Sequence, residues 1–339
     1  MKFNYSQRLE KLRQKMQEHS VDAVVLGGGN RFDANGYYYS GDSAFPSVLL
    51  ITKENAMMFS TMQAADLPYF FNVLPFKDWR KKLKQEVDAI KPQKVALDSR
   101  SDLLGLFAFA KSSYEKVNFT QQLLQIREKK DTEEIKLIKK AQSITKNAVA
   151  RTLEENLAGL TENQVAGKIE AHARELNSSL DAFTPIVQSG ERSAVFHNSA
   201  SSAKLDLKTP LLIDVGCRCE FYCGDYTTTV YEGSDKFTKD ALEAVRESQK
   251  QAQYVAEREK SGKKASETAL AVLKEYGFSQ NTYRDVGLGL GHSVGLEVHD
   301  GWRRVDDIEK TEKGMCFTIE PGLYFPKMFG VRFEDIAII

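Results

Sequence analysis

Acidic residues stand directly beside strand-forming segments in the second half of the chain. Asp214 follows the apolar run 211–213, and Asp225 precedes the Thr-rich run 227–230. Both runs predict β-strands, because apolar and β-branched side chains fit a half-buried pleated surface. The segment between them is short enough for a hairpin, which would bring the two carboxylates side by side.

These carboxylates need a positive partner, because burying an unpaired charge is costly. Arg218 is the only obvious candidate nearby, so a metal ion is the simplest counter-charge. Three further residues repeat the pattern: His292 lies in a glycine-rich segment, and Glu320 and Glu334 end or interrupt apolar strands. Four carboxylates resist joint ionisation at one site, and two divalent cations would balance them.

Oxygen-rich ligation with a single imidazole suits Mn²⁺, with Co²⁺, Fe²⁺ or Zn²⁺ as alternatives. Two ions roughly 3.5–4 Å apart would hold and deprotonate a bridging water, giving a nucleophile at neutral pH. Any one of these acidic residues alone is better explained as a solvent-facing strand end. The recurrence of four acidic residues and one histidine in such contexts favours a shared site.

The bulk composition narrows the class of protein. The 339 residues suffice for two domains, and Lys+Arg and Asp+Glu both number 47. The resulting zero net charge gives no electrostatic reason to expect nucleic acid or a membrane surface. The N-terminal segment has no signal-peptide pattern, and the apolar runs are far shorter than the ~20 residues of a membrane helix. We predict a soluble, cytoplasmic protein with reduced cysteines, and neither a nucleic-acid nor a membrane partner.

Helical and strand periodicities alternate in the first part of the chain and predict a compact α/β domain over residues 1–124. The expected elements there are helices at 5–19 and 103–110 and strands at 22–26, 47–52, 56–59 and 94–97. In the second domain, 125–339, a helix capped by Asp131 or Thr132 and another capped by Thr161 come first. Strands and loops follow from about 183, with two helices at 235–259 and 264–276.

The order of motifs resembles a known family. The motifs are D-V-G at 214–216, D-x-T-x-T at 225–229, G-H-x-x-G-L-E-V-H-D at 291–300, T-I-E-P-G-x-Y at 318–324 and V-R-x-E-D at 331–335. This order is similar to that of the pita-bread metallopeptidases, which include methionine aminopeptidases, Xaa-Pro aminopeptidases and Xaa-Pro dipeptidases (prolidases). The implied fold class is α/β (α+β): a small creatinase-like N-terminal α/β domain followed by a pita-bread (creatinase/aminopeptidase) catalytic domain.

The resemblance also implies a role for each site residue. Asp214 would bind one metal ion, His292 and Glu320 the other, and Asp225 and Glu334 both. His197 would assist proton transfer to the leaving amine, and His299 would steady the scissile carbonyl and the oxyanion. Three more residues are implied to lie behind the ligands or near the substrate: Arg332, Tyr324 and Thr227.

We therefore expect dinuclear-metal-dependent hydrolysis of short peptides with proline at the second position, by an Xaa-Pro dipeptidase or Xaa-Pro aminopeptidase that forms a homodimer. The N-terminal domain argues against a plain methionine aminopeptidase. Two rivals stay open: a catalytically inactive pita-bread domain that binds peptides or proteins, and a metal-free creatinase-like hydrolase. Retention of all five ligands and both histidines argues against them.

Two features depart from the family pattern. Thr228 occupies the position where the family usually has Arg, which predicts weaker metal binding or altered stability. The last strand, ending at Ile339, is shorter than usual, and we expect this to affect packing near Glu334.

Overall fold

The chain forms two compact units, Met1–Ile126 and Arg127–Ile339, each with its own hydrophobic core. In a computed structural model, the described residues are 3–29, 32–43, 46–60, 71–101, 112–179 and 181–339. The helix expected at 103–110 lies outside them. The domain boundary after residue 124 stays a prediction.

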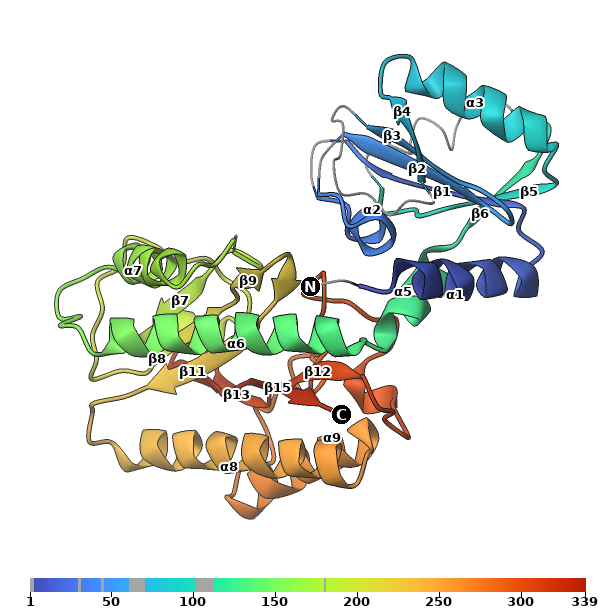
Figure 1. The fold of residues 1–339 in the computed structure, drawn as a ribbon. Coiled ribbons are helices and arrows are strands. Elements are labelled where there is room, and N and C mark those ends of the chain that lie inside the picture. The colour runs from blue at the N-terminus through green and yellow to red at the C-terminus, as the bar shows by residue number, and fades with distance from the viewer. Residues whose placement is uncertain (1–2, 30–31, 44–45, 61–70, 102–111, 180) are drawn as a thin grey trace. The chain divides into compact units, whose positions relative to one another are not determined.

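A six-stranded sheet in the order β4-β3-β2-β1-β5-β6 is the centre of the first unit. Its strands are β1 (Ala23–Gly28), β2 (Ser47–Thr52), β3 (Ala56–Ser60), β4 (Phe71–Pro75), β5 (Lys94–Leu97) and β6 (Glu115–Asn118). The helices are α1 (Tyr5–Glu18), α2 (Ala34–Ser40), α3 (Trp79–Ile90) and α5 (Thr120–Glu128), the last ending just beyond the unit. Helices α1 and α2 lie on one side of the sheet and α3 on the other (Figure 1). Strands β2 and β3 pair antiparallel.

Two pairs of helices enclose short strands in the second unit (Figure 1). Helices α6 (Thr132–Leu153) and α7 (Glu162–Glu175) lie on one side, and α8 (Lys236–Arg258) and α9 (Gly262–Glu275) on the other. The strands are β7 (Ile186–Ser189), β8 (Leu211–Val215), β9 (Arg218–Cys219), β10 (Tyr222–Cys223), β11 (Tyr226–Val230), β12 (Cys316–Ile319), β13 (Gly322–Phe325), β14 (Phe329–Arg332) and β15 (Asp335–Ile338). They form the sheets β11-β8-β7, β10-β9, β12-β15 and β13-β14.

The helix starts follow their capping residues. Asp131, rather than Thr132, caps α6, and its side chain and that of Glu134 each accept a hydrogen bond from the other's backbone. Thr161 and Gln164 form the same reciprocal box at α7, as expected. None of the described helices is both long and apolar enough to cross a membrane.

The pairing of β8 with β11 decides which side chains reach the space between the helix pairs. Thr227 stands opposite Asp214, and a smaller hairpin of β9 and β10 connects the two strands. Thr227 and Thr229 both hydrogen-bond to the 332–334 segment, so Thr228 faces the other side of the strand. The family departure at Thr228 is therefore on the face away from the carboxylates.

Candidate active site

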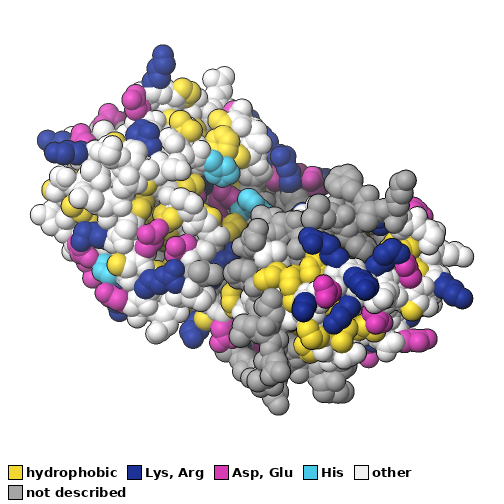
Figure 2. All heavy atoms as spheres, turned by 90° about the horizontal axis from the view of Figure 1, so that it is seen from above, with side chains coloured by type: hydrophobic (Ala, Val, Ile, Leu, Met, Phe, Trp, Pro, Cys, Tyr) yellow, Lys and Arg dark blue, Asp and Glu magenta, His cyan; other side chains and the backbone are white. Residues whose placement is uncertain are grey.

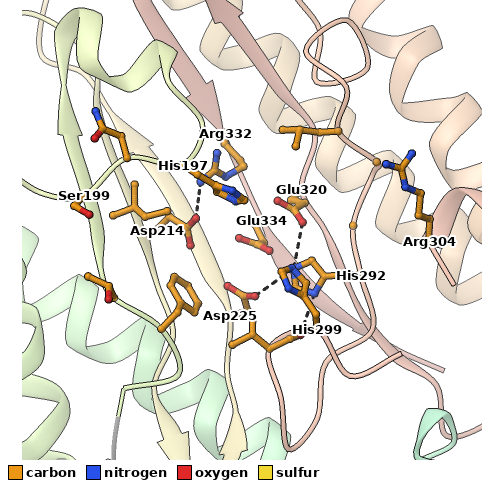
Figure 3. Close-up of a pocket in the computed structure, with 18 residues that line it drawn as sticks. His197, Ser199, Asp214, Asp225, His292, His299, Arg304, Glu320, Arg332 and Glu334 are labelled. Carbon is orange, nitrogen blue, oxygen red and sulfur yellow. Dashed lines mark hydrogen bonds and ion pairs between the residues drawn. The ribbon is translucent and has the colours of Figure 1, made fainter. Parts of the chain in front are cut away.

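A cavity of about 590 Å³ in the second unit brings the predicted residues together (Figure 3). All five predicted metal ligands line it, together with His197, His299 and Arg332. The apolar part of its wall consists of Phe183, Ile186, Leu288 and Val298. On the surface, histidine and acidic side chains gather in a hollow (Figure 2).

Three of the predicted ligands form the tightest group. Ligand atoms of Asp225, His292 and Glu334 lie within 4.8 Å of one another. Glu320 completes the group on the His292 side, with its Oε1 3.4 Å from the imidazole Nε2. Asp225 comes just before β11, Glu320 just after β12, and Glu334 between β14 and β15. Strand ends from distant parts of the sequence therefore converge on one point.

Asp214 lies at the other side of the group and has an arginine partner. Arg332 donates from its Nη2 to the Oδ2 of Asp214, and the side chains of both are nearly inaccessible. The other carboxylate oxygen, Oδ1, is buried and has no hydrogen-bond partner among the described residues. A buried anionic oxygen without a donor is costly, and a cation would satisfy it. The sequence offered Arg218 as the counter-charge, but its guanidinium donates to the backbone carbonyls of Phe221 and Leu296 instead.

The backbone fixes the orientation of His292. Its Nδ1 lies 3.0 Å from the carbonyl oxygen of Val298, which only accepts, so Nδ1 carries the proton. Nε2 therefore presents a lone pair to the carboxylates, the arrangement that metal-binding histidines adopt. Gly291 makes the position possible, because a Cβ there would collide with the backbone carbonyl of Thr318. Burial, with a smaller effect of His299, lowers the pKa of His292 to about 3, so the imidazole is neutral.

The acidic residues raise one another's proton affinity. Burial, followed by the charges of Asp214 and Glu320, raises the pKa of Asp225 well above its usual value. Burial and the charge of Asp225 do the same to Glu334, and burial raises the pKa of Glu320 to about 7. The single positive charge of Arg332 lowers these pKa values, but by less than burial and the neighbouring carboxylates raise them. The donor set, four carboxylates and one imidazole nitrogen, fits hard to borderline divalent cations.

The two remaining histidines flank this group. His197 lies on the Asp214 side of the cavity, and His299 packs edge-on against His292 with ring centroids 4.0 Å apart (Figure 3). Burial is the main cause that lowers the pKa of His197 and of His299. Arg332 contributes at His197, and His197 contributes at His299. Both imidazoles are therefore neutral at neutral pH, with one N–H and one acceptor nitrogen each.

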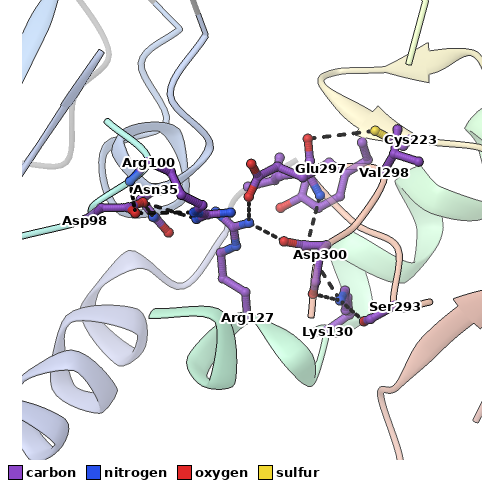
Figure 4. A network of polar contacts seen from close by, with 12 residues as sticks. Asn35, Asp98, Arg100, Arg127, Lys130, Cys223, Ser293, Glu297, Val298 and Asp300 are labelled. Carbon is purple, nitrogen blue, oxygen red and sulfur yellow. Dashed lines mark hydrogen bonds and ion pairs between the residues drawn. The ribbon is translucent and has the colours of Figure 1, made fainter. Parts of the chain in front are cut away.

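A buried ionic network holds the segment that carries His299 (Figure 4). Arg127 is fully buried and donates to the carboxylates of Asp300 and Glu297. The ammonium of Lys130 pairs with the carboxylate of Asp300 at 3.5 Å and donates a hydrogen bond to the hydroxyl of Ser293 at 3.2 Å. The network ties the start of the second unit to residues 293–300, the segment that carries His299.

Of the other predicted residues, Thr227 and Tyr324 do not line the cavity and contact the site from behind. Thr227 donates from its hydroxyl to Oε2 of Glu334 at 2.6 Å. The Nη1 of Arg332 donates to the hydroxyl of Tyr324 at 2.8 Å. Arg332 itself reaches the cavity through its pairing with Asp214.

Sequence reasoning missed three residues. Gln142 contacts the backbone of Asp225, Glu162 holds the segment around His197, and Arg304 lines the cavity. A glutamine on the buried face of α6 and a glutamate next to a helix cap carry no metal-binding signal. The only sequence signal for Arg304 is its position, five residues after His299 in the same loop.

Known proteins resemble the chain over nearly its whole length. Residues 136–339 match the metallopeptidase family M24, and residues 8–129 match the creatinase/prolidase N-terminal domain. The Xaa-Pro dipeptidase of Pyrococcus furiosus is 32% identical, with 98% of this chain and 95% of the relative covered. The Xaa-Pro dipeptidase of Pyrococcus horikoshii is also 32% identical, with 98% and 94% covered.

Solved structures agree with this relationship. The X-Pro aminopeptidase from Thermotoga maritima superimposes with a TM-score of 0.83 at 29% identity, with 98% of this chain and 97% of that chain covered. The prolidase from Pyrococcus furiosus gives a TM-score of 0.84 at 29% identity, with 96% of each chain covered. Fold and site together define a pita-bread hydrolase with a creatinase-like first unit, which confirms the predicted fold class. The chain belongs to metallopeptidase family M24.

Proposed function

We propose that the chain is an Xaa-Pro dipeptidase that uses two divalent metal ions, with Mn²⁺ the best suited to the ligands. The observation that carries the proposal is the group of four carboxylates and one imidazole nitrogen facing a cavity beside two neutral histidines. Similarity to two proteins named Xaa-Pro dipeptidase supports the choice of substrate. A cytoplasmic homodimer remains our prediction from the sequence.

In this proposal Asp214 would hold one ion, His292 and Glu320 would hold the other, and Asp225 and Glu334 would serve both. The lone pair on Nε2 of His292 and the unpartnered Oδ1 of Asp214 support the assignment. Such ions, when bound, polarise the peptide carbonyl and lower the pKa of a water molecule.

The histidines would handle the proton and the carbonyl oxygen. The prolyl nitrogen leaves as a secondary amine, so it must gain a proton as the C–N bond breaks. A neutral imidazole can take a proton from the attacking water and deliver it, and we assign this role to His197. His299, on the opposite flank, would donate an N–H to the oxygen of the scissile carbonyl.

Arg304 favours a dipeptide over a longer peptide. It is exposed at the cavity and has no acidic partner within the described part of the chain. The C-terminal carboxylate of a dipeptide lies on its proline, close to the scissile bond, where a guanidinium can bind it in a bidentate manner. A tripeptide has an uncharged amide at the same place.

The first test is hydrolysis of Ala-Pro and Ala-Pro-Ala in parallel after loading with Mn²⁺. We expect cleavage of Ala-Pro by the wild type and none by Asp225→Asn. Arg304→Gln should raise the KM for Ala-Pro about tenfold, the effect of one lost charge-assisted hydrogen bond, and Arg304→Lys should raise it less. Preferred cleavage of the tripeptide would assign an Xaa-Pro aminopeptidase, and no cleavage of either would contradict proline specificity.

A further inference from the structure

Both polar atoms of the Gln142 side chain form hydrogen bonds to the segments that carry two of the proposed ligands. It lies on α6 and is buried, with 7% of its surface exposed. Its Oε1 accepts the backbone N–H of Asp225 at 2.8 Å. Its Nε2 donates to the backbone carbonyl of Asp225 at 2.7 Å and to Oδ1 of Asp335 at 2.8 Å. Asp335 directly follows Glu334 in the chain.

The two-point contact with Asp225 constrains the backbone and not only a side chain. A buried residue must satisfy both its N–H and its C=O, and a primary amide can satisfy both at once. Holding both groups fixes where the Asp225 backbone sits and how it is rotated. The direction of its carboxylate follows from that.

The third hydrogen bond links the Gln142 amide to Asp335, the residue that follows Glu334. Lys146, one helical turn further along α6, holds the other carboxylate oxygen of Asp335. Thr227 then connects the two ligand segments directly, because its carbonyl accepts the backbone N–H of Glu334 at 3.0 Å. The positions of Asp225 and Glu334 are therefore set from one side by α6 and from the other by β11.

We propose that Gln142 is a positioning residue of the metal centre, which sets the spacing between Asp225 and Glu334 and so the affinity for divalent cations. The inference rests on the proposed metal site and goes beyond it, since no ligand or catalytic role is assigned to Gln142. Groups that orient metal ligands typically change metal affinity about 10- to 100-fold when they are removed.

The test measures metal binding without relying on peptidase activity. Metal-free protein is titrated with Mn²⁺, and free Mn²⁺ is followed by its electron paramagnetic resonance signal. Gln142→Met keeps the volume and removes all three hydrogen bonds. Gln142→Glu keeps the size and the acceptor for the Asp225 N–H but removes both donors. For each variant, thermal unfolding of the metal-free protein is recorded as a separate readout.

Thr152→Val is the matched control. Thr152 lies on the same helix, is fully buried, and hydrogen-bonds to the carbonyl of Ala148 at 2.9 Å and to His172 at 3.0 Å. Its contacts involve no ligand segment. Loss of its hydroxyl should lower the unfolding temperature and leave Mn²⁺ binding unchanged.

We expect Gln142→Met to raise the Mn²⁺ dissociation constant at least about tenfold, and Gln142→Glu to raise it as well. Wild-type affinity in either folded Gln142 variant would overturn the positioning role alone. Equal weakening in Thr152→Val would overturn it too, because the effect would then follow stability. If the wild type itself binds no Mn²⁺, the proposed metal centre and this inference both fail. If Gln142→Met does not fold, Gln142→Glu decides the outcome.

Discussion

At the scale of single residues, the carboxylates of the site are held close together against their mutual repulsion. Burial raises the pKa of Glu320 from 4.5 to about 7, and the pKa of Asp225 and that of Glu334 rise in the same direction. A carboxyl group whose pKa is higher in the folded state stabilises the protein below the unfolded value. That contribution is lost as the pH rises through the folded value.

We therefore predict that the metal-free protein becomes less stable between about pH 4.5 and pH 7, as Glu320 ionises. Bound cations replace the protons, so saturating Mn²⁺ should remove most of the loss. Urea unfolding midpoints at about pH 5.5 and pH 8, with chelator or with Mn²⁺, measure both effects. Glu320→Gln should reduce the pH dependence in chelator, and an unchanged dependence would contradict the assignment to this site.

At the scale of elements, the first turn of α7 holds the segment that carries His197. Glu162 is fully buried, and its carboxylate accepts the backbone N–H of Ser189 at 3.0 Å and of Ser201 at 2.9 Å. The Nε of Arg192 also donates to it, at 3.0 and 3.1 Å. One side chain thus fixes the chain on both sides of His197.

For this reason Glu162→Gln should lower kcat/KM for Ala-Pro about tenfold or more, as expected when a buried charge-assisted contact is lost. Mn²⁺ affinity should be unchanged, because no proposed ligand lies in the held segment. Steady-state kinetics and the Mn²⁺ titration separate the two quantities. A parallel loss of Mn²⁺ binding would show that the whole site had been disturbed.

The network around Arg127 belongs to the same scale, because it ties two chain segments together. Removing one partner of a buried ion pair leaves an uncompensated charge, so Arg127→Met should lower the free energy of unfolding by about 3–5 kcal/mol. The exposed pair Arg151–Glu175 is the control: Arg151→Met should cost no more than about 1 kcal/mol. Urea denaturation of both variants gives the comparison, and equal losses would contradict the prediction.

At the scale of the whole molecule, local signals predicted the helices of the second unit but missed α2, α3 and α5 in the first. Periodicity and capping residues placed α6 through α9, and the motif order predicted the family, which the comparisons confirm. Pairing across long sequence distances was not predictable, because it follows from strand register and helix packing. The partner of Asp214 is Arg332 rather than Arg218, and Gln142 reaches Asp225 only once α6 packs on the strands.

The pairing of Asp214 with Arg332 also bears on how the chain folds. The two residues are 118 positions apart, and such non-local contacts form slowly because a long loop must close first. Until β14 packs beside β8, Asp214 lacks its partner Arg332, and Glu334 has not yet reached the site. We expect refolding experiments to recover helical structure before Mn²⁺ binding, so that metal affinity reports the last steps of folding.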